Sequence, residues 1–99
     1  MTISSKINGR RAVISITGRI DTITAPRLER EIKAVTEHTS ELVLDFSSLD
    51  YISSAGLRSL LTSKKQLPEG CTMEITGCND ELYEIFEITG FNDIFDLKR

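Results

Sequence analysis

Apolar and polar residues alternate near the start of the chain, as they do in a strand with one buried face. Within residues 12–17, Ala and Ile side chains share one face and hydroxyl side chains occupy the other. Residues 3–7 form a weaker strand candidate. The Asn8-Gly9 pair between the two segments is typical of a two-residue hairpin turn, because both positions accept positive φ. We therefore expect an opening hairpin whose second strand ends at Gly18.

The next segment has a helical period. Leu28, Ile32 and Val35 recur at i, i+4 and i+7 among charged residues, which is the pattern of an amphipathic helix lying on a sheet. Thr24 is a candidate N-cap, and Pro26 fits the first turn because its missing N–H has no partner there anyway.

Two further helices are predicted later in the chain. The first begins at Ser53 or Ser54, and the second begins at Asn79 or Asp80 and ends at Gly90. The apolar residues that define them are Leu57, Leu60 and Leu61 in the first, and Leu82, Ile85 and Phe86 in the second.

Two more strands separate these helices. Residues 42–44 are an unbroken apolar run, typical of a central strand buried on both faces between helices, and residues 45–48 are expected to lead out of it. Residues 71–75 alternate between apolar and polar side chains. Residues 91–97 have an ambiguous pattern that is compatible with a short helix docking the carboxyl end, and it does not decide their state.

This order of elements predicts an α/β fold with a mixed, mostly parallel sheet of about four strands. The opening hairpin adds the antiparallel strand, the parallel strands are joined by right-handed helical crossovers, and we expect three to four helices in all. We expect the helices to tend toward a three-layer arrangement. With 99 residues, the chain is expected to be a single domain over residues 1–99.

Composition excludes several kinds of partner. The net charge is −3, and the Lys and Arg residues do not cluster as a nucleic-acid-binding stripe does. No apolar run approaches the length of a membrane helix, and the first residues lack the pattern of a signal peptide. We expect a cytoplasmic protein with no nucleic acid, membrane insertion or small-molecule substrate.

Metal and cofactor chemistry also lack candidate residues. Cys71 and Cys78 stand seven positions apart, and His38 lies far from both in sequence, so no zinc-type spacing can be written. We expect two ordinary thiols rather than a disulfide, no metal and no cofactor.

Two polar segments are expected to meet at one edge of the sheet. Residues 18–24 and 45–56 each follow a predicted parallel strand, and the carboxyl ends of such strands are where α/β proteins bind ligands.

Residues 44–61, Leu-Asp-Phe-Ser-Ser-Leu-Asp-Tyr-Ile-Ser-Ser-Ala-Gly-Leu-Arg-Ser-Leu-Leu, resemble the signature of bacterial anti-sigma factor antagonists of the STAS-domain type. The upstream Gly18-Arg19-Ile20-Asp21 also matches that family's pattern. The resemblance covers nearly the whole chain, since the inferred order of elements agrees with it, and it implies a STAS-like fold.

The resemblance implies a binding switch without catalysis of its own. In such proteins an anti-sigma factor with serine kinase activity phosphorylates a serine at the start of a helix. The unphosphorylated form binds that anti-sigma factor and so releases a sigma factor, and a phosphatase resets the cycle. The acceptor falls on Ser54 and the family's loop aspartate on Asp21. The expected partner-binding residues are Asp21, Thr22, Thr24, Asp50, Ser53, Ser54, Ala55, Gly56, Leu57 and Arg58.

One departure from the family pattern concerns the acceptor. The residue before it is commonly an aspartate, and here it is Ser53, so Ser53 is the second choice for phosphorylation. A phosphate at a helix start is tolerated by the unpaired N–H groups and the helix dipole. We therefore expect phosphorylation to block binding by charge and bulk rather than by unfolding.

The same residues also have ordinary structural interpretations. Ser53 and Ser54 are, on local sequence alone, ordinary caps, and Asp21 is a turn residue as readily as a contact residue. Two other functions compete: a STAS subunit of another system, such as a lipid-transport complex, and a small hydrolase with Ser54 as nucleophile. The hydrolase is disfavoured because the sequence places no histidine or lysine base beside Ser54.

Overall fold

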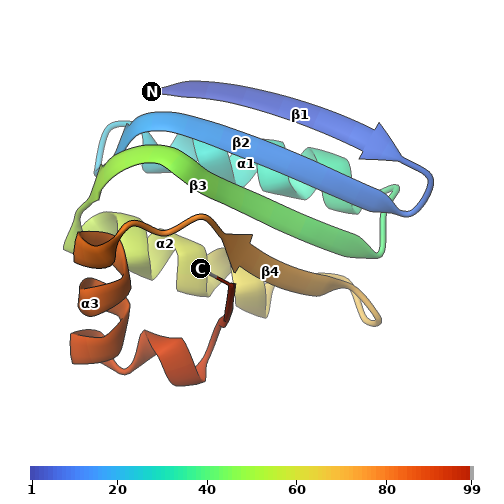
Figure 1. Ribbon diagram of the computed structural model, residues 1–99. Helices are drawn as coiled ribbons and strands as arrows, with labels where there is room; N and C mark the ends of the chain where they lie inside the picture. Colours follow the sequence, from blue (N-terminus) through green and yellow to red (C-terminus); the bar gives the residue numbers. More distant parts are fainter. Residues whose placement is uncertain (99) are drawn as a thin grey trace.

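The structure, a computed structural model, describes residues 1–98 and is built on one mixed sheet (Figure 1). The strands lie in the order β1-β2-β3-β4-β5, with β1 antiparallel to β2 and the other pairs parallel. The elements are β1 (Thr2–Asn8), β2 (Arg11–Ile20), α1 (Ala25–Thr36), β3 (Glu41–Ile52), α2 (Ser54–Lys65), β4 (Thr72–Thr76), α3 (Asp80–Thr89), the 3-10 helix η1 (Phe91–Asp93) and β5 (Asp96–Lys98).

This architecture confirms the predicted fold class. The sheet has one strand more than expected. The end of the chain, whose secondary structure the sequence pattern did not decide, forms η1 and then the short strand β5 beside β4. Phe86 and Phe91 both pack against Phe95, with ring centroids 6.0 Å apart in each pair, and this aromatic contact brings the end of the chain back to the sheet.

The opening hairpin is confirmed with its turn one residue later than predicted. Asn8 pairs with Arg11, so the two loop residues are Gly9 and Arg10 rather than Asn8 and Gly9. Gly9 has φ 62°, while Arg10 does not have positive φ. A glycine at the first loop position is the hallmark of the type II′ hairpin turn, whose twist matches the flanking strands.

Both central strands run further than the sequence suggested. We expected β2 to end at Gly18 and residues 45–48 to leave the sheet, and both predictions were wrong. β2 continues to Ile20 and β3 to Ile52, with register shifts between Ser15 and Thr17 and after Gly18. Gly18 has φ 99°, a conformation that glycine adopts without steric cost, so it bends the strand without ending it.

The helices cover one face of the sheet, so the expected three layers are two. Residues from α1, α2 and α3 join alternate residues of β2, β3 and β4 in one hydrophobic core. Figure 1 shows α1 and α2 behind the sheet. Val43, on the opposite face, lies outside that core yet is only 5% exposed. On this face Arg11, rather than a helix, lies next to Val43. Arg11 forms ion pairs with Glu41 and Glu74 at 3.6 and 3.7 Å.

Caps define where the helices begin and end. Asn79 Oδ1 accepts a hydrogen bond from Leu82 N at 2.8 Å, and Gly90 ends α3 with φ 77°, both as predicted. Thr24 occupies the N-cap position of α1, but its hydroxyl makes no capping bond to that helix.

The helices found within residues 1–98 include none with the length and apolar character of a membrane span.

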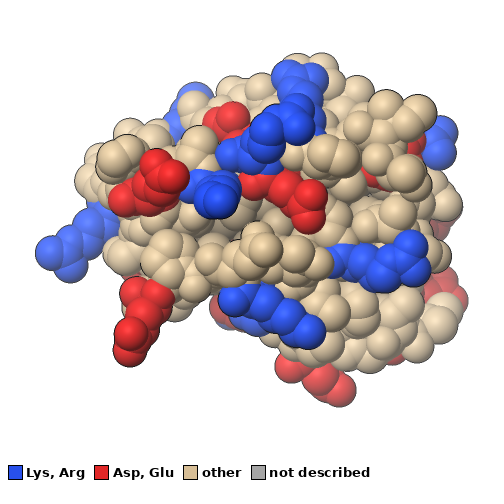
Figure 2. Space-filling view, turned by 180° about the vertical axis from the view of Figure 1, so that it is seen from behind, with Lys and Arg blue, Asp and Glu red and all other residues tan. Residues whose placement is uncertain are grey.

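The surface seen from behind the sheet carries charges of both signs. Figure 2 shows Lys and Arg side chains scattered among acidic and uncharged residues on this face rather than joined in one stripe. Alternation of this kind along α1, which carries Arg27, Arg30 and Lys33 beside Glu29 and Glu31, is typical of a solvated helix face.

Candidate functional site

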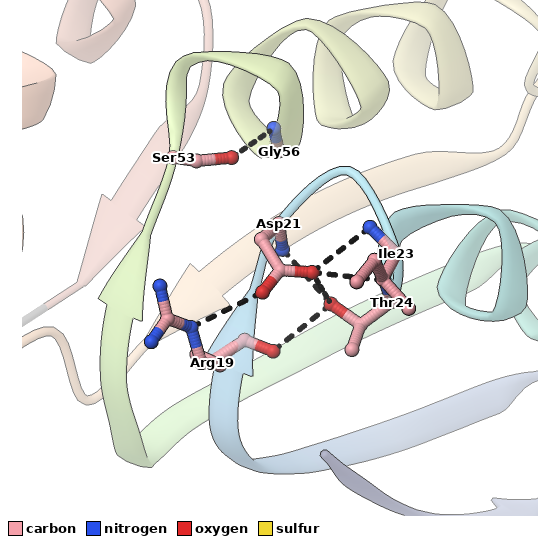
Figure 3. A network of polar contacts seen from close by, with 6 residues as sticks. All are labelled: Arg19, Asp21, Ile23, Thr24, Ser53 and Gly56. Atoms are coloured by element: carbon pink, nitrogen blue, oxygen red, sulfur yellow. Dashed lines mark hydrogen bonds and ion pairs between the residues drawn. The ribbon is translucent and has the colours of Figure 1, made fainter.

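The turn between β2 and α1 is held together by the Asp21 carboxylate. Asp21 Oδ1 accepts hydrogen bonds from the N–H groups of Ile23 and Thr24, each at 3.0 Å (Figure 3). Thr24 Oγ1 in return accepts from Asp21 N at 2.8 Å and donates to Arg19 O at 3.0 Å. These bonds satisfy the backbone groups that a turn of this kind would otherwise leave unpaired.

The same contacts keep Asp21 ionised. The N–H of Thr24 is the largest influence, and with the N–H of Ile23, the Thr24 hydroxyl and Arg19 it outweighs desolvation and lowers the pKa of Asp21. Hydrogen bonds donated to a carboxylate favour its charged form. Asp21 is therefore a structural anion in this turn as well as a candidate contact residue.

Arg19 connects the turn to the neighbouring strand. Its Nε lies 3.1 Å from Asp21 Oδ2, and its guanidinium carbon lies 5.0 Å from the centre of the Tyr51 ring. Arg19 and Tyr51 are direct partners across β2 and β3, which explains the stacking. The sequence did not single out this pair, because only the strand register brings the two residues together.

The start of α2 separates the two candidate hydroxyls. Ser53 is the N-cap: its Oγ accepts from Gly56 N at 3.1 Å. Ser54 is the first residue of the helix, is exposed, and makes no side-chain hydrogen bond with residues 1–98. The two neighbouring serines therefore differ in kind, one a cap and the other a hydroxyl open to solvent.

The two polar segments meet, as their positions after parallel strands predicted. Ser53 N donates to Ile20 O at 2.9 Å, so the first residue before α2 lies against the last residue of β2. Gly56 makes this approach possible: a Cβ there would lie 2.8 Å from Ile52 Cγ1 and 2.9 Å from both Ile20 Cγ2 and Ile20 O. Figure 3 shows the Asp21 turn next to the Ser53–Gly56 start of the helix.

The predicted partner-binding residues fall into groups by exposure. Thr22, Asp50, Ser54 and Arg58 are exposed, and Asp21, Thr24, Ser53 and Ala55 are half-buried. Gly56 and Leu57 are buried, so their side of the helix packs against the sheet. Their contact with a partner stays a prediction, as it does for the other eight.

Ile23 is the site residue that sequence reasoning missed. It is 87% exposed on the Asp21 turn, and Tyr51, the stacking partner of Arg19 in the same region, is 45% exposed. An isoleucine flanked by threonines carries no periodic pattern, so only its position in the turn distinguishes it.

Within residues 1–98 there is no group of three or more His, Cys, Asp or Glu side chains that could hold a metal ion.

Comparison with known proteins agrees with this geometry. The sequence matches the STAS domain family over residues 2–99. BtrV of Bordetella bronchiseptica, whose name gives it the expected role of anti-sigma factor antagonist, is 40% identical over 91% of this chain and 78% of its own. The anti-sigma-B factor antagonist of Listeria monocytogenes is 30% identical over 99% of this chain and 90% of its own.

Solved structures give the same result. The anti-sigma factor antagonist from Mycobacterium paratuberculosis superposes with a TM-score of 0.88 at 28% identity, covering 98% of this chain and 84% of that one. SpoIIAA, known in unphosphorylated and phosphorylated forms, shares the fold with TM-scores of 0.75 and 0.74 at 12% and 13% identity, covering 99% and 97% of this chain and 87% and 90% of those chains. The chain therefore belongs to the STAS domain family, together with the anti-sigma factor antagonists.

Proposed function

We propose that this protein is an anti-sigma factor antagonist that binds an anti-sigma factor through the edge of the sheet formed by the Asp21 turn and the start of α2. The bound anti-sigma factor is a serine kinase, and its phosphorylation of Ser54 ends the complex. Release of a sigma factor in the cytoplasm follows from binding, and a phosphatase restores the binding form. The protein itself receives phosphate and catalyses nothing.

The observation that carries the proposal is the state of the Ser54 hydroxyl. It is exposed at the first position of α2 and makes no hydrogen bond with the described residues, so a kinase reaches it without disturbing the fold. Relatives of this chain are named as anti-sigma factor antagonists, and SpoIIAA of the same fold has a phosphorylated form.

The choice of Ser54 over Ser53 rests on the cap. Ser53 Oγ accepts the Gly56 N–H, and modification of that oxygen would compete with a bond whose loss costs about 0.5–2 kcal/mol. Modification of Ser54 breaks no such bond. The missing aspartate before the acceptor is therefore replaced, at position 53, by a residue that still caps the helix.

The effect of the phosphate is on the partner rather than on the fold. A phosphate at Ser54 would add about −1.5 to −2 charges near the positive end of the α2 dipole, which stabilises it locally by about 0.3–1 kcal/mol. The same charge beside the Asp21 carboxylate makes the surface more negative and larger. Like charges brought together in an interface cost several kcal/mol, and about 1.4 kcal/mol is tenfold in affinity.

The test is capture of partners by four forms of the protein. Wild type, Ser53→Ala, Ser54→Ala and Ser54→Asp are used as baits in lysate of the source organism, and the captured ATPase-type partner is then purified and titrated against each form. We expect the first three to bind it and Ser54→Asp to bind it at least about tenfold more weakly. Equal binding by all four would refute the proposed switch.

Phosphate transfer is tested separately with the purified partner and Mg-ATP. Mass spectrometry of the product should place the phosphate on Ser54 in wild type and in Ser53→Ala, and Ser54→Ala should take up none. Phosphate on Ser53 in the wild type would contradict the assignment of the acceptor.

The two competing functions give different results in the same experiments. A hydrolase would turn over generic esters or phosphoesters with a rate abolished by Ser54→Ala, yet neither His38 nor any lysine forms a hydrogen bond with Ser54 in residues 1–98. A STAS subunit of a lipid-transport complex would capture transport components instead of an ATPase-type kinase.

A further inference from the structure

Ile23 exposes more of its side chain than any other large hydrophobic residue of the described chain. It is 87% exposed, against 76% for Ile88, 54% for Ile7, 45% for Tyr51 and 41% for Ile94. A single exposed aliphatic side chain is common on protein surfaces. Ile23 differs from the other exposed isoleucines in that it lies within the candidate site, on the turn whose Asp21 carboxylate accepts its N–H.

The backbone under Ile23 is held in place before any partner arrives. Its N–H donates to Asp21 Oδ1 at 3.0 Å, and Asp21 is itself bonded to Thr24 on one side and paired with Arg19 on the other. A contact residue on a preorganised turn binds more tightly than one on a mobile loop, because less conformational entropy is lost on association.

The position of the turn ties Ile23 to Ser54. Ile20 O accepts a hydrogen bond from Ser53 N at 2.9 Å. The turn that contains Ile23 begins at Asp21, directly after Ile20. Figure 3 shows Ile23 and the start of α2 in the same small region. A partner that covers the Ser54 hydroxyl therefore meets Ile23 as well.

The charges around Ile23 describe the surface that it fits. Arg19, the cation beside the turn, is paired with Asp21 and stacked on Tyr51, so the two opposite charges partly offset each other next to Ile23. The Ile23 side chain itself presents aliphatic surface to a partner. Apolar residues of this kind, held rigidly at the centre of an interface, carry much of its binding energy when they enter a pocket.

We propose that Ile23 is the apolar anchor of the complex, inserting into a hydrophobic pocket of the anti-sigma factor beside the place where that protein contacts Ser54. This inference rests on the proposed function and assigns a specificity residue to it. Burial of an isoleucine side chain corresponds to about tenfold to a hundredfold in affinity. Ile23 contributes to affinity in the unphosphorylated complex and takes no part in phosphate transfer.

The test compares two exposed isoleucines. Ile23→Ala, Ile23→Leu and the matched control Ile88→Ala, on α3, are titrated calorimetrically with the purified anti-sigma factor in Mg-ADP, and thermal melts check that all remain folded. We expect Ile23→Ala to lose at least about tenfold in affinity, Ile23→Leu to retain most of it, and Ile88→Ala to stay within about twofold.

Kinetics of phosphorylation give a second measurement. Because Ile23 does not touch the reacting atoms, Ile23→Ala should raise the KM for this protein as substrate while leaving kcat unchanged. Unchanged affinity and KM in Ile23→Ala would overturn the anchor, even where Ser54→Asp still abolishes binding. Failure of the wild type to bind any anti-sigma factor would overturn the proposed function and the anchor with it.

Discussion

The two strand-to-helix junctions of this site occupy equivalent places in the sheet but are built differently. After β2, side chains of Asp21 and Thr24 bond the turn to itself and to Arg19. After β3, the chain enters α2 at once, with only the Ser53 cap between strand and helix. The first junction is fixed by its own side chains, and the second leaves the Ser54 hydroxyl open.

Under the proposed function, this difference separates two tasks of one surface. A residue that is modified has to be reachable and must not hold the fold together, which describes Ser54. A residue that supplies constant affinity benefits from a rigid backbone, which describes Ile23 on the Asp21 turn. Substitutions at each junction should therefore affect stability and binding to different extents.

The largest expected effect is at Gly56, where the two junctions touch. Gly56→Ala places a Cβ within 2.9 Å of Ile20 O, a backbone atom that cannot move aside, and within 2.8 Å of Ile52 Cγ1. Overpacking costs about 1–3 kcal/mol and outweighs the gain of up to about 1 kcal/mol in helix propensity. Urea denaturation should show a clear loss of stability.

The matched control for Gly56→Ala is Thr62→Ala, on the exposed side of the same helix. It should stay within about 0.5 kcal/mol of wild type. An equally stable Gly56→Ala would mean that the two junctions are not in the close contact described.

The next effect distinguishes the two serines. Ser53→Ala removes the bond to Gly56 N and should destabilise the protein by about 0.5–2 kcal/mol, whereas Ser54→Ala should stay within about 0.5 kcal/mol of wild type. Chemical denaturation of both variants at one pH measures the difference. Equal losses would contradict the division into a cap and an open hydroxyl.

A smaller effect of opposite sign is expected for the phosphomimetic variant. Ser54→Asp places a negative charge in the first turn of α2 and should stabilise the fold by about 0.3–1 kcal/mol relative to the neutral isostere Ser54→Asn, less at high salt. The same variant should bind the anti-sigma factor more weakly. Loss of both stability and binding would favour unfolding as the switch.

The sequence predicted helix ends and the meeting of the two polar segments better than the lengths of the central strands. The cap at Asn79, the stop at Gly90 and the meeting of residues 18–24 with 45–56 follow from short patterns and from the topology of parallel strands. The end of β2 could not be predicted in this way. Glycine weakens a strand in an isolated sequence pattern, and β2 continues past Gly18 because it keeps pairing with β3.

The covering of the sheet was not predictable for a related reason. An apolar run such as residues 42–44 indicates burial but not what provides it. Val43 is buried in the region of Arg11, whose charge pairs with Glu41 and Glu74. Likewise, the Arg19–Tyr51 stacking depends on a strand register that no local pattern specifies.

The smallest expected effect is the pH dependence of the Asp21 turn. The N–H of Thr24, with the other donors and Arg19, lowers the pKa of Asp21 in the folded chain. The carboxylate therefore contributes stability that is fully present above about pH 4, the ordinary pKa of aspartate, and is lost as the pH falls through the lower pKa of the folded form. Asp21→Asn keeps an acceptor oxygen but has no such titration.

The difference in unfolding free energy between wild type and Asp21→Asn should therefore shrink on acidification from about pH 7 to about pH 3, measured by urea denaturation. Asp50→Asn, which removes the same charge from an exposed residue without a side-chain hydrogen bond in residues 1–98, is the control for net charge. A gap between wild type and Asp21→Asn that stays constant with pH would mean that the turn is held by the geometry of the side-chain oxygen and not by its charge.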